Sequence, residues 1–97
     1  MAEFNIIGEC FNPQTDLKLF YTDEEISSQR FDYPLTPIAS EDRSLAHLFH
    51  RLGKFQSVGE AKKNGWDKPI PTGWNHFVIG KGSKRWDFYL WNPSTVN

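Results

Sequence analysis

The sequence predicts a small α+β fold in which two short helices pack on an antiparallel sheet made of an N-terminal and a C-terminal hairpin. Three observations predict it. The chain of 97 residues is long enough for one hydrophobic core, so we expect a single domain over residues 1–97. Apolar residues recur at helical spacing between positions 45 and 52. They alternate with polar residues near both ends of the chain.

The N-terminal hairpin is expected from two apolar segments on either side of a turn. Residues 4–10 include the β-branched Ile6 and Ile7, and residues 12–16 are turn formers that begin with Asn12 and Pro13. Residues 17–21 alternate in hydropathy, which is typical of a strand. The two strands would be joined by a loop longer than two residues.

A short helix and an extended connector are expected next. Thr22 and Glu25 have the spacing of a capping box, in which the threonine oxygen and the glutamate carboxylate accept hydrogen bonds from amides at a helix start. Few apolar residues follow, so this helix should be short. Pro34 and Pro37 exclude helix over residues 32–40 and favour extended backbone.

The second half of the chain predicts a helix, a tight turn and another helix. Ser40 and the two acids after it can cap a helix that ends at Gly53. Ser57 and Glu60 form a second capping-box pattern, opening a helix that ends near Gly65. The apolar face of the first of these helices comprises Leu45, Leu48, Phe49 and Leu52.

A C-terminal hairpin is expected from strands over residues 74–79 and 85–91, joined by the glycine- and lysine-rich turn 80–84. Side chains alternate between the two faces of a strand. Trp86, Phe88 and Leu90 should therefore share one face of the second strand.

Charge separates along the chain although the net charge is only -1. Residues 1–43 carry nine acids and three bases, a net charge of -6, and residues 44–97 carry eight bases and three acids, a net charge of +5. We therefore divide the expected domain into an acidic part, 1–43, and a basic helix-turn-helix plus hairpin part, 44–97. A basic surface attracts phosphates, whereas an acidic surface can mimic them. Alternatively, the two parts neutralise each other through surface ion pairs.

Several function classes are disfavoured. No apolar stretch approaches the ~18 residues that span a bilayer. Cys10 is the only cysteine, and the start of the chain lacks a signal-peptide pattern, so we expect a cytoplasmic protein. His47 and His50 lie three residues apart, but no nearby cysteine or third histidine completes a tetrahedral metal site, and His76 is isolated. No set of acid, base and nucleophile is visible. We expect no enzyme, no cofactor and no metal.

Basic residues interleaved with aromatic ones give the main functional hypothesis, which is a non-catalytic nucleic-acid-binding accessory protein. Cations neutralise phosphates, and exposed aromatic rings stack on bases. Trp74 and Trp91 belong to the same pattern, but most tryptophans of so small a protein should lie in its core, so we expect one or two exposed at most. The candidate contacts are Arg51, Lys54, Ser57, Lys62, Lys63, Trp66, Lys68, Lys81, Lys84 and Arg85.

Residues 45–81 resemble the small RNA-binding module of ribosomal small-subunit protein four, which is also found in tyrosyl-tRNA synthetases and pseudouridine synthases. The resemblance implies that Ser57 caps the second helix and that Lys54, Lys62 and Lys63 contact RNA phosphates. Val58 stands where the family usually has arginine, and the second helix is about one turn shorter than in the family. The matching positions are Leu48, Leu52, Gly53, Lys54, Phe55, Ser57, Glu60, Ala61, Lys62, Lys63, Gly65, Val78, Ile79, Gly80 and Lys81.

A second hypothesis follows from the acidic part. Residues 57–71 look like segments of small proteins from bacteriophages and mobile elements, which are often host-takeover factors or inhibitors of bacterial defence. An inhibitor of this kind, for example an anti-CRISPR or anti-restriction protein, would present its acidic side chains to a host protein or nucleoprotein that normally holds nucleic acid. The acidic candidates are Asp23, Glu24, Glu25 and Asp32. RNA, DNA, a host protein and a second copy of the chain all stay open as partners.

Overall fold

A computed structural model describes residues 2–29 and 34–93 of the chain. By internal contacts the chain forms two compact units. The first, here called the sheet unit, comprises Met1–Pro37 and Thr72–Asn97, and the second, the helical unit, is Ile38–Pro71. The small α+β fold predicted from the sequence is confirmed. The acidic and basic parts of the sequence do not coincide with these units, because the sheet unit takes residues from both.

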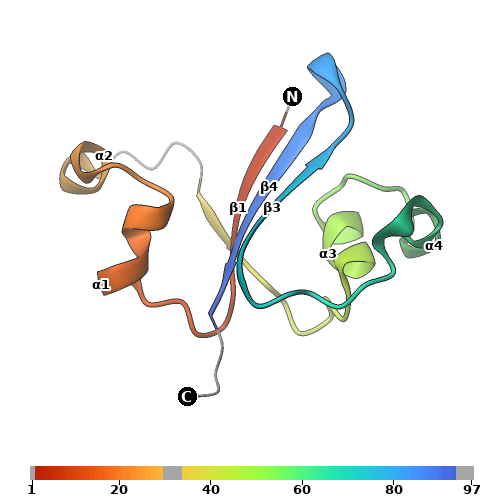
Figure 1. Cartoon of the computed structure of the whole chain (residues 1–97), viewed down its shortest axis with the longest axis horizontal. Coiled ribbons are helices and arrows are strands. Elements are labelled where there is room, and N and C mark those ends of the chain that lie inside the picture. The colour runs from red at the N-terminus through yellow and green to blue at the C-terminus, as the bar shows by residue number, and fades with distance from the viewer. Residues whose placement is uncertain (1, 30–33, 94–97) are drawn as a thin grey trace. The chain divides into compact units, whose positions relative to one another are not determined.

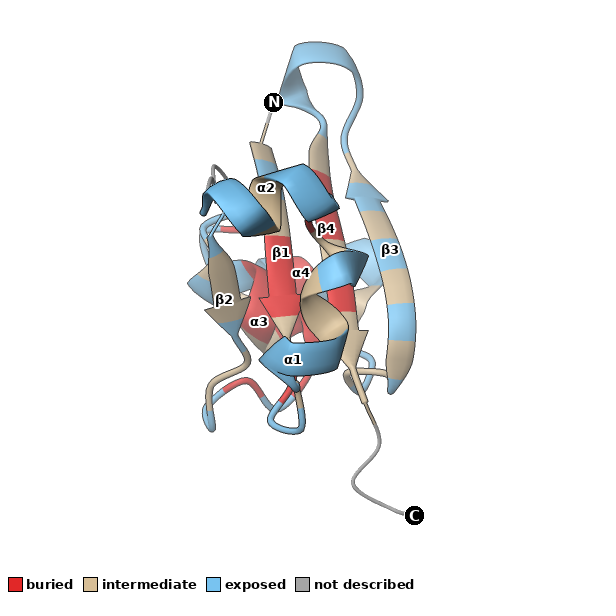
Figure 2. Ribbon diagram, turned by 90° about the vertical axis from the view of Figure 1, so that its left-hand side faces the viewer, coloured by how far each residue is buried: buried red, intermediate tan, exposed pale blue. Residues whose placement is uncertain are grey.

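Four strands, seen along the chain in Figure 1 and labelled across the sheet in Figure 2, form one sheet in the order β2-β1-β4-β3. They are β1 Ala2–Ile7, β2 Leu35–Pro37, β3 Gly73–Ile79 and β4 Trp86–Asn92. The expected C-terminal hairpin is present, since β3 and β4 pair antiparallel. The sheet as a whole is mixed, because β1 lies parallel to both β2 and β4.

Residues 17–21, expected to be a strand, form a short helical segment and a turn instead. They follow the helix α1 (Pro13–Asp16) and include the 3-10 helix η1 (Leu17–Leu19). The side chain of Asn12 accepts a hydrogen bond from the amide of Gln14, and Pro13 occupies the first turn. These are helix-start features, and they outweigh the short alternation that follows. The second neighbour of β1 is then β2, whose Pro37 is tolerated because β2 is an edge strand.

The capping box at Thr22 is confirmed. It opens α2 (Asp23–Ser28), where Thr22 accepts from the amide of Glu25 and the Glu25 carboxylate accepts from the amide of Thr22. The helix ends after six residues at Gln29, whose φ of 58° is left-handed. Both α1 and α2 lie on the same side of the sheet (Figure 2).

One face of the sheet carries the apolar core of the sheet unit. Ile6, Phe88 and Leu90 are fully buried on β1 and β4. The ring of Phe4 stacks on Phe88 with centroids 5.4 Å apart and on Trp86 at 5.6 Å. The expected common face of Trp86, Phe88 and Leu90 is therefore present, and the buried strands are visible at the centre of Figure 2.

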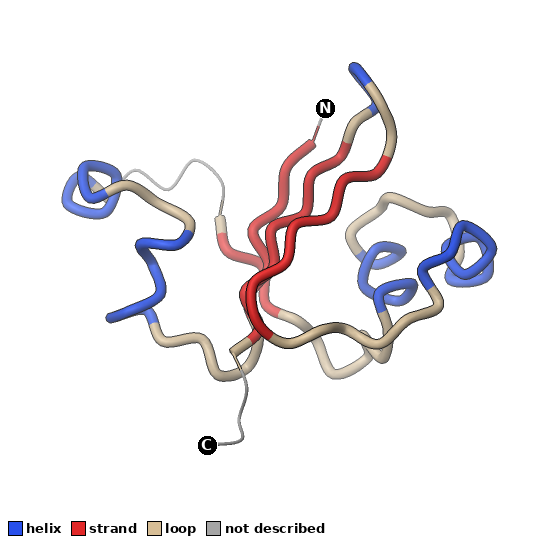
Figure 3. The backbone as a smooth tube through the Cα atoms, in the orientation of Figure 1, coloured by secondary structure: helices blue, strands red, loops and turns tan. Residues whose placement is uncertain are grey.

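The helical unit contains α3 (Leu45–Arg51), α4 (Val58–Ala61) and the π-helical segment η2 (Lys62–Trp66), drawn in blue in Figure 3. Ser44, not Ser40, caps α3, because its hydroxyl accepts from the amide of His47. Trp66 packs edge-on against the buried Phe49 at 5.0 Å. In residues 2–29 and 34–93, no helix has the length and apolar character needed to cross a membrane.

Candidate functional site

The ten predicted nucleic-acid contacts are divided between the two units. The sheet unit holds Lys81, Lys84 and Arg85, which belong to the turn between β3 and β4. The helical unit holds Arg51, Lys54, Ser57, Lys62, Lys63, Trp66 and Lys68. Neither unit therefore carries all ten of the predicted contacts.

Two of the predicted cations are held by carboxylates. The guanidinium of Arg51 donates two hydrogen bonds to Asp42 Oδ2, from Nε at 3.0 Å and from Nη2 at 2.7 Å. The hydrogen bond to Asp42 raises the pKa of Arg51 above its ordinary value. Arg85 pairs with Asp87 in the same way, with Nη2 2.8 Å from Oδ1. Arg51 and Arg85 are thus structural partners of these aspartates, and they offer less charge to a phosphate than the sequence suggests.

Two further predicted contacts have structural roles in the helical unit. The hydroxyl of Ser57 accepts from the amide of Glu60 at 3.0 Å, as the N-cap of α4. This cap agrees with the role expected for Ser57. Trp66 is half-buried against Phe49, so only part of its ring is open to a partner.

Three lysines of the helical unit do present open charge. Lys62, Lys63 and Lys68 are exposed, and their ammonium groups form no ion pair with any described residue. Lys62 and Lys63 are adjacent at the start of η2. The whole helical unit carries six bases and four acids, a net charge of +2. It is a mildly basic module.

The acidic candidates are only partly available. Asp23 and Glu24 are exposed in the first turn of α2, where carboxylates are favoured by the helix dipole. Glu25 uses its Oε1 to accept from the amide of Thr22 at 2.9 Å, so it is needed for the capping box. Asp32 lies outside the described residues.

Sequence reasoning missed a partly exposed aromatic face of the sheet. On β3, Trp74, His76 and Val78 alternate outward, and both Trp74 and Val78 are 44% exposed. The register places His76 opposite Tyr89 of β4 and Val78 opposite Asp87. We call Trp74, His76 and Tyr89, together with Phe20, which directly follows η1, the aromatic face.

Each ring of the aromatic face packs against at least one other ring of the face. His76 stacks flat on Tyr89, with ring centroids 4.4 Å apart and planes 9° from parallel. Trp74 lies 6.3 Å from Tyr89 and 5.4 Å from Phe20. Cross-strand aromatic pairs of this kind hold one another in place. The exposed tryptophan is therefore orientated by its neighbours.

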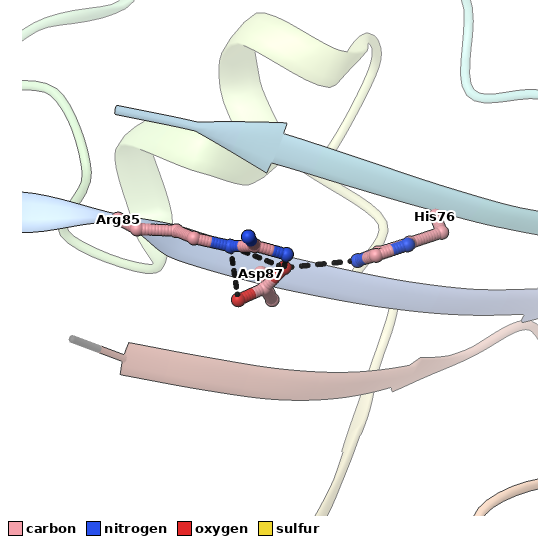
Figure 4. Close-up of polar contacts among 3 residues, drawn as sticks. All are labelled: His76, Arg85 and Asp87. Atoms are coloured by element: carbon pink, nitrogen blue, oxygen red, sulfur yellow. Dashed lines mark hydrogen bonds and ion pairs between the residues drawn. The ribbon is translucent and has the colours of Figure 1, made fainter. Parts of the chain in front are cut away.

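A buried carboxylate fixes the polar end of this face (Figure 4). Asp87 is 6% exposed, and its Oδ1 accepts from Arg85 Nη2 at 2.8 Å and from His76 Nε2 at 3.0 Å. The hydrogen bond from Arg85, and after it the one from His76, lowers the pKa of Asp87. Because Asp87 can only accept, the proton of His76 must lie on Nε2. This hydrogen bond fixes the orientation of the imidazole against Tyr89.

A cleft of about 140 Å³ opens beside the aromatic face. Its lining combines three aromatic rings with one carboxylate and one carboxamide. Burial, and after it the charge of Glu3, raises the pKa of Tyr89, so its phenol stays protonated. The lining residues are Glu3, Asn5, Leu19, Phe20, Trp74 and Tyr89.

The histidines singled out in the sequence have hydrogen-bonding roles. His47 Nδ1 lies 2.8 Å from the Ser44 hydroxyl, and His50 Nδ1 lies 3.0 Å from the carbonyl of Phe55. Among the described residues there is no group of three or more His, Cys, Asp or Glu side chains that could hold a metal ion.

The signal for the aromatic face was present in the sequence but incomplete. The alternation of Trp74, His76 and Val78 marks one face of a strand. Recognising the face also requires the pairing of β3 with β4 and of β4 with β1, which brings Tyr89 and Glu3 alongside. These pairings join distant segments, so local patterns do not supply them.

Comparison with protein-family models found no match to the chain. The searches of curated proteins and of solved structures likewise returned no significant match.

Proposed function

We propose that this protein binds single-stranded nucleic acid, with bases stacking on the aromatic face of the sheet unit. The observation that carries the proposal is the row of Trp74, His76 and Tyr89 rings on neighbouring strands, with Trp74 44% exposed. The binding is non-catalytic and takes place in the cytoplasm, as expected for a chain whose single cysteine has no disulfide partner.

Base stacking supplies the affinity in this proposal. An aromatic side chain that stacks on an unpaired base contributes about 1–3 kcal/mol, and any base can use it. Sheet surfaces with exposed aromatic residues on adjacent strands are a recurring way to bind single strands. The exposed Trp74 and the half-buried Tyr89 lie on adjacent strands in this way, while the apolar core lies on the opposite face of the same strands.

Phosphate contacts come from the turn that joins β3 and β4. Lys81 and Lys84 are exposed there, at the end of the same hairpin that carries Trp74 and Tyr89. The sheet unit has eight acids and five bases, a net charge of -3, so it does not attract nucleic acid through its overall field. Stacking therefore dominates, and electrostatic attraction is local.

The salt dependence of binding tells which lysines take part. For single strands, log K falls with log salt concentration by ~0.7 for each phosphate neutralised. Two contacts, from Lys81 and Lys84, give a slope of about -1.4. A slope near -3.5 would mean that Lys62, Lys63 and Lys68 of the helical unit contact phosphates as well.

The test compares Trp74→Ala with Val78→Ala. Trp74 and Val78 have the same fractional exposure, 44%, on the same face of β3. Both variants therefore truncate a half-exposed apolar side chain, but only Trp74→Ala removes a ring that can stack on a base. Fluorescence polarisation with labelled 12-nucleotide RNA and DNA at 20 mM salt measures the affinity. Loss of about 1–3 kcal/mol, or ~5- to 150-fold, is expected for Trp74→Ala, and little change for Val78→Ala.

Two results would overturn the proposal. One is the absence of any single-strand binding by the wild-type protein at 20 mM salt. The other is equal affinity for the two variants. If neither oligonucleotide binds, a pull-down from bacterial lysate, with and without nuclease, asks whether a protein is the partner. There Glu24→Lys is the informative variant, because Glu24 is exposed and, unlike Glu25, does not close the capping box.

A further inference from the structure

We infer that the cleft beside the aromatic face selects guanine over the other bases, with Glu3 as the residue that reads the base. This inference rests on the proposed function and names the ligand class of the same face. Three properties of the cleft carry it, which are its size, its aromatic walls and its one uncommitted carboxylate.

The cleft has the size of one heterocycle. Its volume is about 140 Å³, well below the ~300–1,000 Å³ of pockets that hold drug-sized ligands. Phe20, Trp74 and Tyr89 supply aromatic walls. A planar ring system stacks on such walls. The lining therefore favours a single base that inserts into the cleft from a bound nucleic-acid strand.

Glu3 is the only acid among the residues that line the cleft, and its carboxylate is available to a ligand. It lies on β1, directly opposite Asp87 of β4, and its side chain is exposed. Asp87 is engaged by Arg85 and His76, but Glu3 forms no hydrogen bond or ion pair with any described residue. A free carboxylate beside aromatic walls can accept two hydrogen bonds from a ligand.

Guanine is the base that supplies both donors. Its Watson–Crick edge presents N1–H and the N2 amino group side by side. Adenine and cytosine place an unprotonated ring nitrogen next to their amino group, and that lone pair would face the carboxylate. Uracil and thymine have one N–H between two carbonyl oxygens. A carboxylate accepts only, so it pairs twice with guanine and at most once with any other base.

The floor of the cleft is already ordered. Asn5 is 5% exposed and forms a hydrogen bond with Tyr21, which is itself buried. Burial raises the pKa of Tyr21, so the phenol keeps its proton. Asn5 and Glu3 point to the same face of β1, two residues apart. Glu3 therefore extends from a rigid strand, and little order has to be gained when the base enters.

The experiment uses labelled eight-nucleotide RNAs of uridine with a single central G, A or C, and the all-uridine RNA as reference. For the wild-type protein we expect the G-containing RNA to bind more tightly than the others by roughly 5- to 150-fold, the range for one bidentate base contact. Glu3→Gln should abolish that preference. Glutamine offers one acceptor and one donor, which matches the edges of adenine and cytosine, so the order should shift toward these bases.

Glu9→Gln is the matched control, because Glu9 is an exposed acid of the sheet unit that does not line the cleft. Glu3 is exposed, so its substitution should leave folding intact, and unchanged affinity for the all-uridine RNA checks this. Equal affinity of the wild-type protein for all four RNAs, or a preference for G that survives Glu3→Gln, would overturn the inference while the stacking proposal stands. Failure to bind any of the RNAs would overturn both.

Discussion

Removing the carboxylate of Asp42 is the perturbation whose effect the structure defines best. The Asp42 side chain is fully buried and accepts from Arg51 and from the amide of Ala39, at 2.8 Å. It thus ties the end of α3 to the segment that precedes the helix. In Asp42→Ala, Arg51 and the Ala39 amide lose their acceptor.

The size of the loss in unfolding free energy depends on how well each group that has lost its acceptor can be hydrated by water. The side chain of Arg51 is 31% exposed, so it regains part of its hydration and the loss is that of its charged hydrogen bonds, ~1.5–3 kcal/mol. The Ala39 amide adds about 1 kcal/mol. We therefore expect Asp42→Ala to lower the free energy of unfolding by about 3 kcal/mol. Arg51→Ala should cost at least as much, ~3–5 kcal/mol, because it leaves a carboxylate with no exposure without its counter-ion and with only the Ala39 amide as a donor among the described residues.

Urea unfolding followed by far-UV circular dichroism measures these changes, and hydrogen exchange of the α3 amides assigns them to the helical unit. Asp67→Ala is the control, since Asp67 is an exposed acid of the same unit. A loss for Asp42→Ala no larger than for Asp67→Ala, or a loss for Arg51→Ala clearly smaller than for Asp42→Ala, would refute the reasoning.

Three other predictions concern backbone, pH and charge. Gly59→Ala in α4, where an added Cβ would lie 3.8 Å from the Ser57 hydroxyl without a clash, should stabilise by about 0.5–1 kcal/mol. Gly80→Ala should destabilise, because at φ +89° its Cβ would clash with the Lys84 carbonyl. Urea midpoints measure both changes. Because the pKa of Asp87 is lowered in the folded protein, its carboxylate contributes fully to the free energy of unfolding above the ordinary aspartate pKa of ~4. This contribution is lost as the pH falls through the lower pKa of the folded state. In Asp87→Asn, the urea midpoint should therefore decline less steeply below about pH 4 than in the wild-type protein. Lys62→Glu with Lys63→Glu should leave the slope of log K against log salt near -1.4, as in the wild-type protein, if only the β3–β4 turn contacts phosphate. A slope clearly shallower than that of the wild-type protein would assign these lysines to the interface.

Local signals in the sequence predicted the local structure well. Thr22 and Glu25 form the capping box that their spacing indicates, and the apolar positions from Leu45 to Phe49 are the buried face of α3. The C-terminal hairpin lies where its two segments and its glycine turn predicted. Each of these features depends on interactions between residues close in the chain, so their pattern alone determines them.

Features that depend on distant residues were not predicted. The alternation over residues 17–21 is compatible with a strand, but the helix start at Asn12 and Pro13 decides the outcome. Arg51 was predicted to contact phosphate, but it forms an ion pair with Asp42, and no pattern within α3 predicts this partner. The candidate site was mostly missed for the same reason, because Glu3 and Tyr89 become neighbours only through the pairing of β1 with β4.

The position of β4 in the chain constrains how the protein is made. It is the last strand in sequence, yet it lies between β1 and β3 and hydrogen-bonds to both. During synthesis on the ribosome, the edge of β1 that pairs with β4 therefore stays unpaired until residues 86–92 have left the exit tunnel. Meanwhile α3 and α4, which contact each other locally, can already fold. A nascent chain arrested before Trp86 would expose the edge of β1, where chaperones or a second chain can pair.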